Sequence, residues 1–245
     1  MDSVFLFYIL LLVIAFLYAS VGHGGASGYL ALMAIFSIAP EVMKPTALLL
    51  NLFVSLTAFL QFYRGKHFVW KVFLPLALAS VPMAFVGGLI TIDSFIYKKI
   101  LGVLLVFSVI RMLMPAKKAE QELKQANFTG ALLMGGIIGL LSGMIGIGGG
   151  IILSPLLILF HWTDQKQTAA ISALFIFVNS VSGLLGQLTK GIAFSSDMYA
   201  YVGIAFAGGV AGAYFGAMKF KQTVMKKILA VVLVVAAYKL LFTGA

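Results

Sequence analysis

The chain has 245 residues, of which 62% are hydrophobic and 10% are charged, and its mean hydropathy is +1.10. A soluble domain is about half apolar and about one quarter charged, so this composition predicts a protein embedded in a membrane. The absence of cysteine excludes disulfides, cysteine metal sites and thiol chemistry. The net charge of +10 does not indicate a nucleic-acid partner, because the basic residues flank apolar segments, where membrane orientation and anionic lipid headgroups account for them.

The first apolar segment, residues 4–21, carries no charge, follows no basic segment and contains no cleavage signal of small residues. It is therefore predicted to be a retained helix and not a signal peptide. A helix needs about 20 apolar residues to cross the hydrocarbon core. Eight segments have enough apolar residues to be long spans: 4–21, 46–63, 69–92, 97–114, 128–145, 168–188, 198–218 and 224–242. Two shorter segments, 28–39 and 151–162, predict short broken helices.

Each short segment follows a glycine-rich motif, and the two motifs are copies of one pattern. Residues 21–26 read VGHGGA, and residues 145–150, 124 positions later, read IGIGGG. Further matches, such as 97–101 with 225–229, extend the duplication along the chain. The predicted organisation has three parts: a first membrane repeat at 1–115, a polar linker at 116–127 and a second, homologous membrane repeat at 128–245.

Small residues at helical spacing also occur in both repeats. They form two matching trios, Ser80, Ala84 and Gly88 in the first repeat and Gly208, Gly212 and Gly216 in the second. This spacing lets membrane helices approach closely. We therefore expect the glycine face of the second trio to pack against another helix and not against lipid.

The basic residues favour a topology in which the two short segments cross. If they do not cross, the basic residues divide 9 to 8 between the two sides, which gives no orientation. If they cross, the division is 12 to 5, with Lys44, Lys98, Lys99, Lys190 and Lys239 on the smaller side. The larger side is expected to be cytoplasmic. Five elements per repeat also make the repeats inverted, with both termini outside and the linker in the cytoplasm.

The glycine-rich loops are candidate anion sites. A helix that begins just after such a loop directs its free N–H groups and its positive dipole end into the loop. Ser154 and Pro155 resemble an N-cap and a first helical residue, which predicts the start of the second short helix there. The alternative is a seam of close helix packing, which the spacing of Gly24 with Gly28 and of Gly146 with Gly150 also fits.

Uncharged polar residues inside the spans are the other candidates for binding. Asn51 and Asn179 occupy corresponding places in the two repeats, and their amides can donate to an oxyanion. The alternative is hydrogen bonding between helices, which is the role expected for Ser55, Thr57 and Ser172. The predicted substrate-binding residues are Gly24, Gly25, Asn51, Gly148, Gly149, Gly150, Asn179 and Ser182.

His23 lies well inside an apolar stretch, where it either accepts a coupling proton or serves as a hydrogen-bonded structural residue. Three scattered histidines without cysteine or clustered carboxylates make no metal site, and no cofactor is predicted. Charged residues are nearly absent from the long spans, so a carboxylate sodium site and a carboxylate proton relay are not expected. No constellation of nucleophile and base is present, so the chain is not predicted to be an enzyme.

The paired motifs at 22–28 and 146–150, the Ser154-Pro155 that follows and the segment 179–183 with Lys190-Gly191 resemble the TauE/SafE-type sulfite exporter family. The resemblance covers essentially the whole chain, although His23 and Ala26 depart from a plain glycine run. It implies a multi-pass permease of the inner membrane of a prokaryote that moves sulfite or an organosulfonate.

Residues and resemblance together predict an all-α polytopic membrane protein that carries a small anion by alternating access around a site at mid-membrane. A sulfur oxyanion is the preferred substrate. A carrier of a small aromatic or apolar organic acid and a passive anion channel are the alternatives. The expected partners are a small anionic substrate and membrane lipids, with no nucleic acid, and the pattern specifies no oligomeric state.

Overall fold

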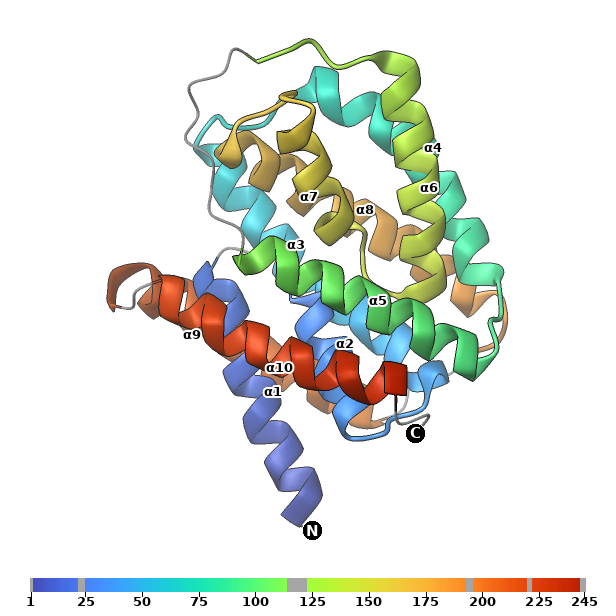
Figure 1. The fold of residues 1–245 in the computed structure, drawn as a ribbon, viewed down its shortest axis with the longest axis vertical. Helices are drawn as coiled ribbons and strands as arrows, with labels where there is room; N and C mark the ends of the chain where they lie inside the picture. Colours follow the sequence, from blue (N-terminus) through green and yellow to red (C-terminus); the bar gives the residue numbers. More distant parts are fainter. Residues whose placement is uncertain (1, 22–24, 114–122, 193–195, 220–221, 243–245) are drawn as a thin grey trace. The chain divides into compact units, whose positions relative to one another are not determined.

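The computed structural model describes residues 2–21, 25–113, 123–192, 196–219 and 222–242, and within these ranges the chain forms ten helices and no strand (Figure 1). A helix occupies each predicted apolar segment. The helices are α1 (Asp2–Val21), α2 (Ala26–Ile35), α3 (Pro40–Arg64), α4 (Trp70–Leu89), α5 (Ser94–Leu113), α6 (Phe128–Ile145), α7 (Gly150–Leu159), α8 (Gln165–Leu188), α9 (Ser196–Lys219) and α10 (Gln222–Phe242).

The helical ends follow ordinary local signals. Asn127 caps α6 by accepting a hydrogen bond from the backbone N–H of Gly130 at 3.0 Å. Asp164 and Gln167 form a reciprocal capping box at the start of α8. These two polar caps mark where the apolar runs of the second repeat begin.

Four helices, α3, α4, α6 and α8, are long and apolar enough in their described residues to cross a membrane. Large apolar side chains such as Leu133 (65% exposed) and Val231 (64% exposed) face outward, as expected for contact with lipid. Helices α2 and α7 have only 10 residues each. At 1.5 Å per residue such a helix is about 15 Å long, half of a hydrocarbon core of about 30 Å. The chain is a polytopic helical membrane protein with two half-length helices.

The helices form two compact units, and each unit draws on both predicted repeats. Unit 1 comprises Met1–Leu50, Ile92–Met114 and Ala193–Ala245, and unit 2 comprises Asn51–Thr91 and Pro115–Ile192. Helix α4 of the first repeat therefore belongs with α6, α7 and α8 of the second, whereas α9 of the second repeat belongs with α1, α2 and α5 of the first. Helix α3 contributes its first part to unit 1 and the rest to unit 2.

In unit 1, α9 packs on α1 through its glycine face. A β-carbon added to Gly208 would lie 2.4 Å from the carbonyl oxygen of Leu12, and one added to Gly212 would lie 2.1 Å from that of Phe16. The predicted helix packing of this face is confirmed for these two glycines, and the surroundings of Gly216 lie outside the described residues. The contacting residue on α9 moves from 208 to 212 as the contacting residue on α1 moves from 12 to 16, so the two helices run in the same direction.

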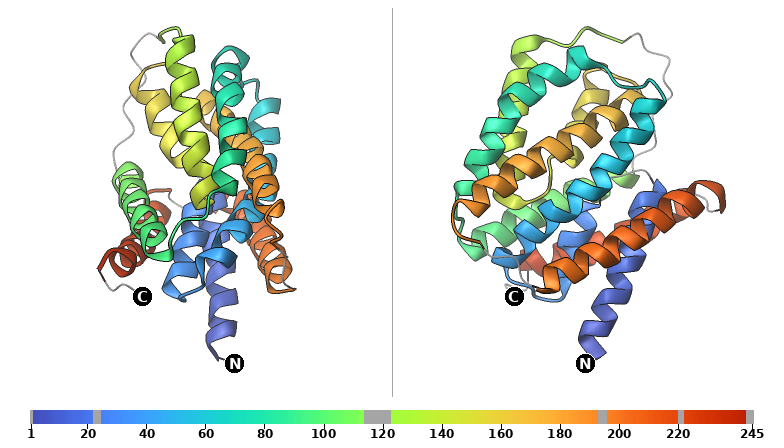
Figure 2. Two further views of the ribbon diagram at one scale, coloured as in Figure 1. Left: turned by 90° about the vertical axis from the view of Figure 1, so that its right-hand side faces the viewer. Right: turned by 180° about the vertical axis from the view of Figure 1, so that it is seen from behind.

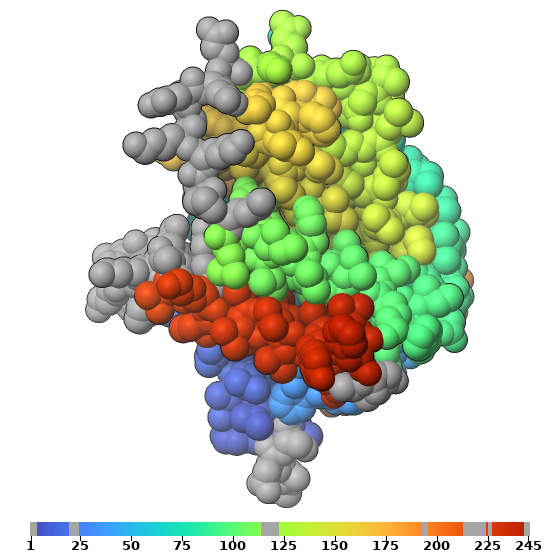
Figure 3. Space-filling model, viewed as in Figure 1, coloured from blue at the N-terminus to red at the C-terminus, as the bar shows by residue number. Residues whose placement is uncertain are grey.

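Also in unit 1, α5 and α10 run in opposite directions. In the first half of α5, the Lys99 ammonium donates to the carbonyl oxygen of Leu241 and Gly102 lies against Leu240 and Leu241, near the end of α10. The side chains of the two helices meet along one continuous surface (Figure 3). Lys239 of α10 donates to the carbonyl oxygen of Ile35 at 2.7 Å, which satisfies an acceptor at the end of α2.

In unit 2, α4, α6 and α8 all run in the same direction (Figure 2). Glycines bring their backbones into direct contact, and the contacting positions advance together on both sides. The pairs on α4 and α6 are Leu76 with Gly135, Ser80 with Gly139 and Ala84 with Gly143. Those on α4 and α8 are Val81 with Ser182, Phe85 with Gly186, and Gly88, which lies between Gly183 and Gln187. Because α8 follows α6 in the same direction, the segment between them must carry the chain back.

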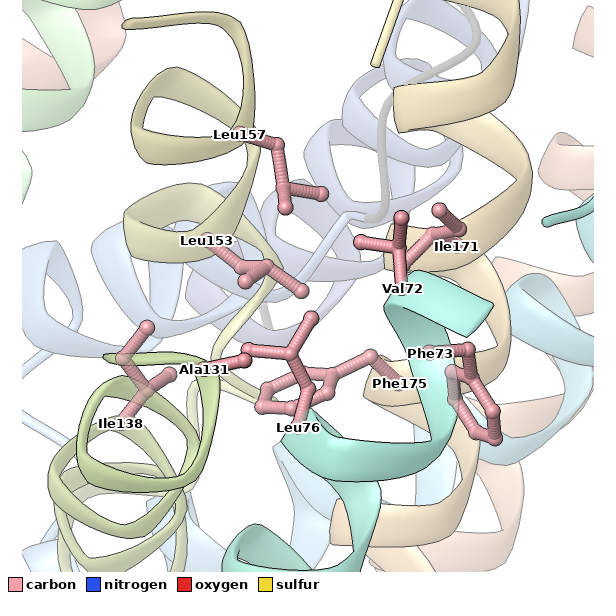
Figure 4. Packing of buried hydrophobic residues seen from close by; sticks show 9 residues of the cluster. All are labelled: Val72, Phe73, Leu76, Ala131, Ile138, Leu153, Leu157, Ile171 and Phe175. Carbon is pink, nitrogen blue, oxygen red and sulfur yellow. The ribbon is translucent and has the colours of Figure 1, made fainter. Parts of the chain in front are cut away.

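That return is made by the glycine-rich loop and α7. Leu153 and Leu157 of α7 share an apolar core with Ala131 near the start of α6 and Ile171 near the start of α8 (Figure 4). The other members of this core are Val72, Phe73, Leu76, Ile138 and Phe175. Helix α7 thus runs opposite to α6 and α8, and it ends close to where they begin.

Candidate functional site

The second glycine-rich loop, Gly146–Gly149, has a backbone that requires glycine. Gly146 caps the end of α6 with φ at +86°, and Gly148 and Gly149 have φ of +75° and +80°. L-residues with a side chain rarely adopt such angles, because the β-carbon then crowds the backbone. The GIGGG sequence therefore builds a tight reversal between two helices, with Gly149 as the N-cap of α7.

The predicted start of the second short helix at Ser154 is wrong. Helix α7 begins at Gly150, and its first turn is closed by the backbone bond from Leu153 N–H to the Gly149 carbonyl oxygen at 3.0 Å. The Ser154 hydroxyl donates to the Gly150 carbonyl oxygen at 2.7 Å and also meets the Ser172 hydroxyl at 2.8 Å. A glycine with positive φ makes the turn on its own, so no hydroxyl cap is needed, and Pro155 lies inside the helix.

The loop reaches the start of α7 about halfway along the neighbouring helices. A β-carbon on Gly149 would lie 2.8 Å from Ile138 and 2.9 Å from Phe175. Ile138 follows the start of α6 by ten residues, or about 15 Å at 1.5 Å per residue. This is the middle depth of a hydrocarbon core of about 30 Å. The free N–H groups at the start of α7 therefore lie at mid-depth in unit 2.

Polar side chains from α3 and α8 surround this loop. A β-carbon on Gly148 would lie 2.7 Å from Asn51 Nδ2 and 3.4 Å from Ser180 Oγ. Asn51 is 1% exposed, and Asn179 and Ser180 are fully buried. In the described part of the structure neither side-chain atom of Asn51 has a hydrogen-bond partner, and neither does the Ser180 hydroxyl. Asn179 donates to the Phe175 carbonyl oxygen at 2.9 Å, whereas its Oδ1 has no partner there.

Unpartnered polar atoms at this depth are unusual. A buried polar group without a hydrogen bond costs about 1–3 kcal/mol, and a bilayer interior supplies no water to relieve it. Here two side-chain donors, Asn51 Nδ2 and Ser180 Oγ, gather beside a helix start whose first N–H groups have no partner within the helix. All of these donors are neutral. The arrangement can bind a small group rich in hydrogen-bond acceptors, and the helix dipole favours a negative charge on it.

The structure brings together four of the eight predicted binding residues: Asn51, Gly148, Gly149 and Gly150. Asn179 precedes Ser180 on α8 and donates to the Phe175 carbonyl oxygen of its own helix. Ser182 is engaged elsewhere, because its hydroxyl donates to the Val81 carbonyl oxygen of α4 at 2.6 Å. Sequence reasoning chose Ser182 and missed Ser180. The sequence alone carries no signal that separates the two serines. In the structure Ser180 follows Ile176 by one helical turn, and Ile176 packs on Gly148 and Gly150.

The first glycine-rich segment has a different environment. Gly25 is the N-cap of α2 with an ordinary φ of −75°, and a β-carbon there would lie 2.4 Å from the ring of Tyr29. A β-carbon on Gly28 would lie 2.3 Å from the ring of Tyr18, whose hydroxyl is hydrogen-bonded to Ser27 at 2.6 Å. The predicted binding residue Gly24 and the predicted coupling residue His23 lie outside the described residues.

The serines and threonines expected to hold helices together divide into two groups. The bond between Ser172 and Ser154 joins α8 to α7, as predicted. Ser55 and Thr57 instead donate to carbonyl oxygens of their own helix, at 2.6 and 2.8 Å. In the described ranges, no group of three or more histidines and carboxylates is placed to hold a metal ion.

A helical bundle with a broken helix and a desolvated polar site at mid-depth defines the class of polytopic membrane transporters. The model of the sulfite exporter TauE/SafE family matches residues 7–240, and the chain belongs to this family.

Curated relatives carry transporter names. The chain is 35% identical over 234 residues to the probable membrane transporter protein y4hK of Sinorhizobium fredii, which covers 94% of this chain and 95% of that one. It is 31% identical over 150 residues to the probable membrane transporter protein MJ0441 of Methanocaldococcus jannaschii, which covers 59% and 55%. It is 24% identical over 229 residues to the probable membrane transporter protein YunE of Bacillus subtilis, which covers 84% and 83%. No solved structure matches the chain. Family and names point to a membrane transporter and not to an enzyme.

Proposed function

We propose that this protein is a secondary transporter in the inner membrane of a prokaryote and that it carries a small anion, with a sulfur oxyanion such as sulfite or an organosulfonate as its substrate. The observation that carries the proposal is a pair of buried donors beside the start of α7, Asn51 Nδ2 and Ser180 Oγ, neither of which has a hydrogen-bond partner among the residues that the structure describes. The family description supports the choice of a sulfur oxyanion.

The donor set suits reversible binding of a compact oxyanion. Its oxygens accept hydrogen bonds from the Asn51 amide, the Ser180 hydroxyl and the first N–H groups of α7, including that of Gly150. Since no cationic side chain is part of this group, the anion is held by dipoles and not by an ion pair. Such a site desolvates the anion without trapping it, as a carrier that must release its substrate requires.

Helix directions support inverted repeats with ten elements. If α7 did not return the chain across the membrane, consecutive spans α6 and α8 would cross in opposite directions. In unit 2 these two helices run in the same direction. Likewise, skipping both short helices would make α5 and α10 parallel, whereas their contacts are antiparallel. The proposal is alternating access, in which the two inverted repeats change their packing around the second loop.

The charges of unit 2 support its orientation. Arg64, Lys66, Lys71, Lys124 and Lys166 lie in or beside the connections at the starting ends of α4, α6 and α8. Lys190 follows the other end of α8. By the positive-inside rule we expect the starting ends to face the cytoplasm, together with the linker 116–127, and both termini to lie outside.

Binding and uptake measurements test the site. Purified protein in proteoliposomes is offered sulfite, sulfate, thiosulfate and a small organosulfonate. Loss of the Asn51 donor in Asn51→Leu is expected to weaken affinity by about tenfold or more, because a hydrogen bond to a charged group contributes about 1.5–3 kcal/mol. Asn51→Asp and Asn179→Asp should weaken it further by placing negative charge beside the anion. Thr57→Val, which removes an exposed hydroxyl bonded to its own helix, is the matched control.

Gly148→Val tests the loop itself, since the side chain would collide with Asn51 and strain a φ of +75°. If folded Asn51→Asp and Gly148→Val variants keep wild-type affinity and rate, the second loop is a packing seam and the proposed site is wrong. Counterflow of labelled substrate separates a carrier from a passive channel, which does not show it.

Cysteine labelling tests the orientation, because the chain has no cysteine of its own. Single cysteines at Lys124 and Lys190, both exposed, should lie on opposite sides. An impermeant thiol reagent applied to intact cells is expected to modify the cysteine at 190 and not that at 124. Modification of both from outside contradicts the inverted model.

A further inference from the structure

We propose that Gln187 of α8 is a second binding station for the transported anion, located between the glycine-rich loop and the end of α8 where Lys190 is exposed. This inference rests on the proposed function and adds a residue to its route. It concerns unit 2 alone, because Gln187, Ser180, Gly148 and Lys190 all belong to that unit.

Gln187 is buried without the partners that a buried amide normally has. It is 3% exposed, and neither Nε2 nor Oε1 has a hydrogen-bond partner in the described part of the structure. An unsatisfied amide inside a membrane protein destabilises the fold, because lipid offers no replacement for the lost water bonds. Polar residues that are buried inside a membrane at this cost often mark substrate and ion pathways.

The position of Gln187 relates it to the loop site. Ser180 and Gln187 are seven residues apart, so they share a face of α8 and are separated by about 10 Å along its axis. The same face meets the loop at Ile176 and Ser180, which lie 2.8 and 3.4 Å from the β-carbon position of Gly148. Between Ser180 and Gln187 this face carries Gly183, which has no side chain, and Leu184, which is 8% exposed.

Glycines also keep the neighbouring α4 close to this part of α8. A β-carbon on Gly88 of α4 would lie 2.3 Å from the Gly183 carbonyl oxygen and 3.2 Å from the Gln187 backbone nitrogen. A β-carbon added to Gly186 of α8 would lie 2.3 Å from the Phe85 carbonyl oxygen of α4. The wall beside Gln187 is therefore backbone, which leaves the amide as the side chain that can respond to a ligand.

Lys190 gives the route a charged entrance. It is exposed, follows the end of α8 and donates a hydrogen bond to Thr91. Within the described part of unit 2 the other basic residues are Arg64, Lys66, Lys71, Lys124 and Lys166, which lie toward the starting ends of the helices. A cation at this end attracts an anion from solution. Lys190, Gln187 and Ser180 then form a series of donors from the exposed end of α8 to the loop.

The Gln187 amide fits an oxyanion in transit. Its Nε2 can donate to an anionic oxygen, and its Oε1 can accept from the hydroxyl of a protonated oxyanion or from a water that travels with the anion. This chemistry is the same as that of Asn51 at the loop, so the ligand can be passed from one amide to the other without an ion pair.

The test compares stability with transport in Gln187→Leu. Replacing an unsatisfied amide by an apolar side chain of similar size is expected to raise Tm by about 2–4 °C. The same change should lower the maximal rate of sulfite uptake about tenfold, while the affinity of detergent-solubilised protein for sulfite stays within about twofold of wild type. Gln61→Leu, a change of the same chemistry at an exposed position of α3, should leave uptake unchanged.

Two outcomes overturn the second station. Wild-type uptake in Gln187→Leu does so, and so does a fall in uptake matched by an equal fall in sulfite affinity, since the residue would then act on the loop site. Should Gln187→Leu fail to fold, Gln187→Met provides the same comparison. Lys190→Gln should raise the KM for sulfite several-fold at low salt with kcat unchanged, and this difference should fade at high salt; a KM that does not change also overturns the route.

The outcomes also separate this inference from the function on which it rests. Weakened binding in Asn51→Leu together with normal uptake in Gln187→Leu overturns the second station and leaves the loop site standing. Failure of wild-type protein to bind or move any of the offered anions overturns both.

Discussion

The two glycine-rich segments occupy corresponding places in the two predicted repeats, yet the space beside their glycines is filled in different ways. Around Gly25 and Gly28 the neighbours are the rings of Tyr29 and Tyr18. Around Gly148 the neighbours are Asn51, Ile176 and Ser180. The first arrangement uses glycine to admit aromatic rings, whereas the second uses it to form a left-handed turn beside desolvated amides.

The difference shows that a glycine pattern alone does not define a site. Gly25 has φ of −75°, which any residue can adopt, so its role in the described part of the chain is to leave room. Gly149 has φ of +80°, so its role is conformational as well as steric. Substitutions can separate these two roles, because a steric clash is relieved by trimming the neighbour and a strained dihedral angle is not.

The largest loss of thermal stability is expected where a glycine packs against rigid backbone. This loss is the reference with which substitutions in the two glycine-rich segments can be compared. Gly212→Leu should lower Tm by more than about 8 °C or prevent folding, because a β-carbon would lie 2.1 Å from the Phe16 carbonyl oxygen. Gly203→Leu, on the same helix with nothing within 4 Å, should be neutral or slightly stabilising. Thermal unfolding in detergent measures both. Equal melting temperatures for the two variants would refute the role of the α1–α9 seam.

An intermediate effect should distinguish the two segments directly. Gly25→Ala and Gly149→Ala are each expected to cost about 2–4 kcal/mol. In a Tyr29→Leu background most of the first cost should vanish, because the colliding ring atoms are gone. In a background that carries both Ile138→Ala and Phe175→Leu, which trims both colliding side chains, at least about 1 kcal/mol of the second should remain, since the left-handed backbone is still strained. A double-mutant cycle gives both couplings. If trimming the neighbours removed the whole cost of Gly149→Ala, the role of glycine would be only steric in both segments, and the proposed difference would be wrong.

The smallest effects concern the tyrosine hydroxyls of the first segment. Tyr18→Phe removes the 2.6 Å bond to Ser27 and should cost about 0.5–1.5 kcal/mol. Tyr29→Phe removes a buried hydroxyl that has no partner in the described residues, so Tm should stay the same or rise slightly. Neither change should alter anion uptake. A loss of uptake in Tyr29→Phe with normal stability would assign a transport role to the first segment too.

Much of the helical framework is predictable from apolar runs. The limits of α6 coincide with the predicted 128–145, because Asn127 precedes an uninterrupted apolar segment and Gly146 ends it. The two half-length helices are also predicted, since each follows a glycine-rich motif. The start of α7 is misplaced by the preference of Ser and Pro for helix starts, which is weaker than the turn that Gly148 and Gly149 make.

Helix pairing and the full site were less predictable. Periodicity indicates that Gly212 faces a helix but does not say that the helix is α1, because membrane helices of similar composition can pair in many ways. The sequence identifies Asn51 and Asn179 as intramembrane amides. The structure places Asn51 beside Gly148 of the second loop, whereas Asn179 donates to the Phe175 carbonyl oxygen of its own helix. Ser180 was overlooked in favour of Ser182 because serines two positions apart on a helix look alike in the sequence, although they face different neighbours.

The placement of α4 and α9 has a consequence for how the chain is made. The glycine face of α9 packs on α1, which is synthesised long before it, so the contact surface of α1 at Leu12 and Phe16 cannot be covered until Gly208 and Gly212 have been made. At about 5–20 residues per second, this delay is roughly 10–40 s. During that interval α1 must be shielded by lipid, by the insertion machinery or by a temporary partner helix. A chain stopped after the first repeat would lack the partner of α1, and its α4 would lack both α6 and α8, so the order of synthesis makes the second repeat complete the first.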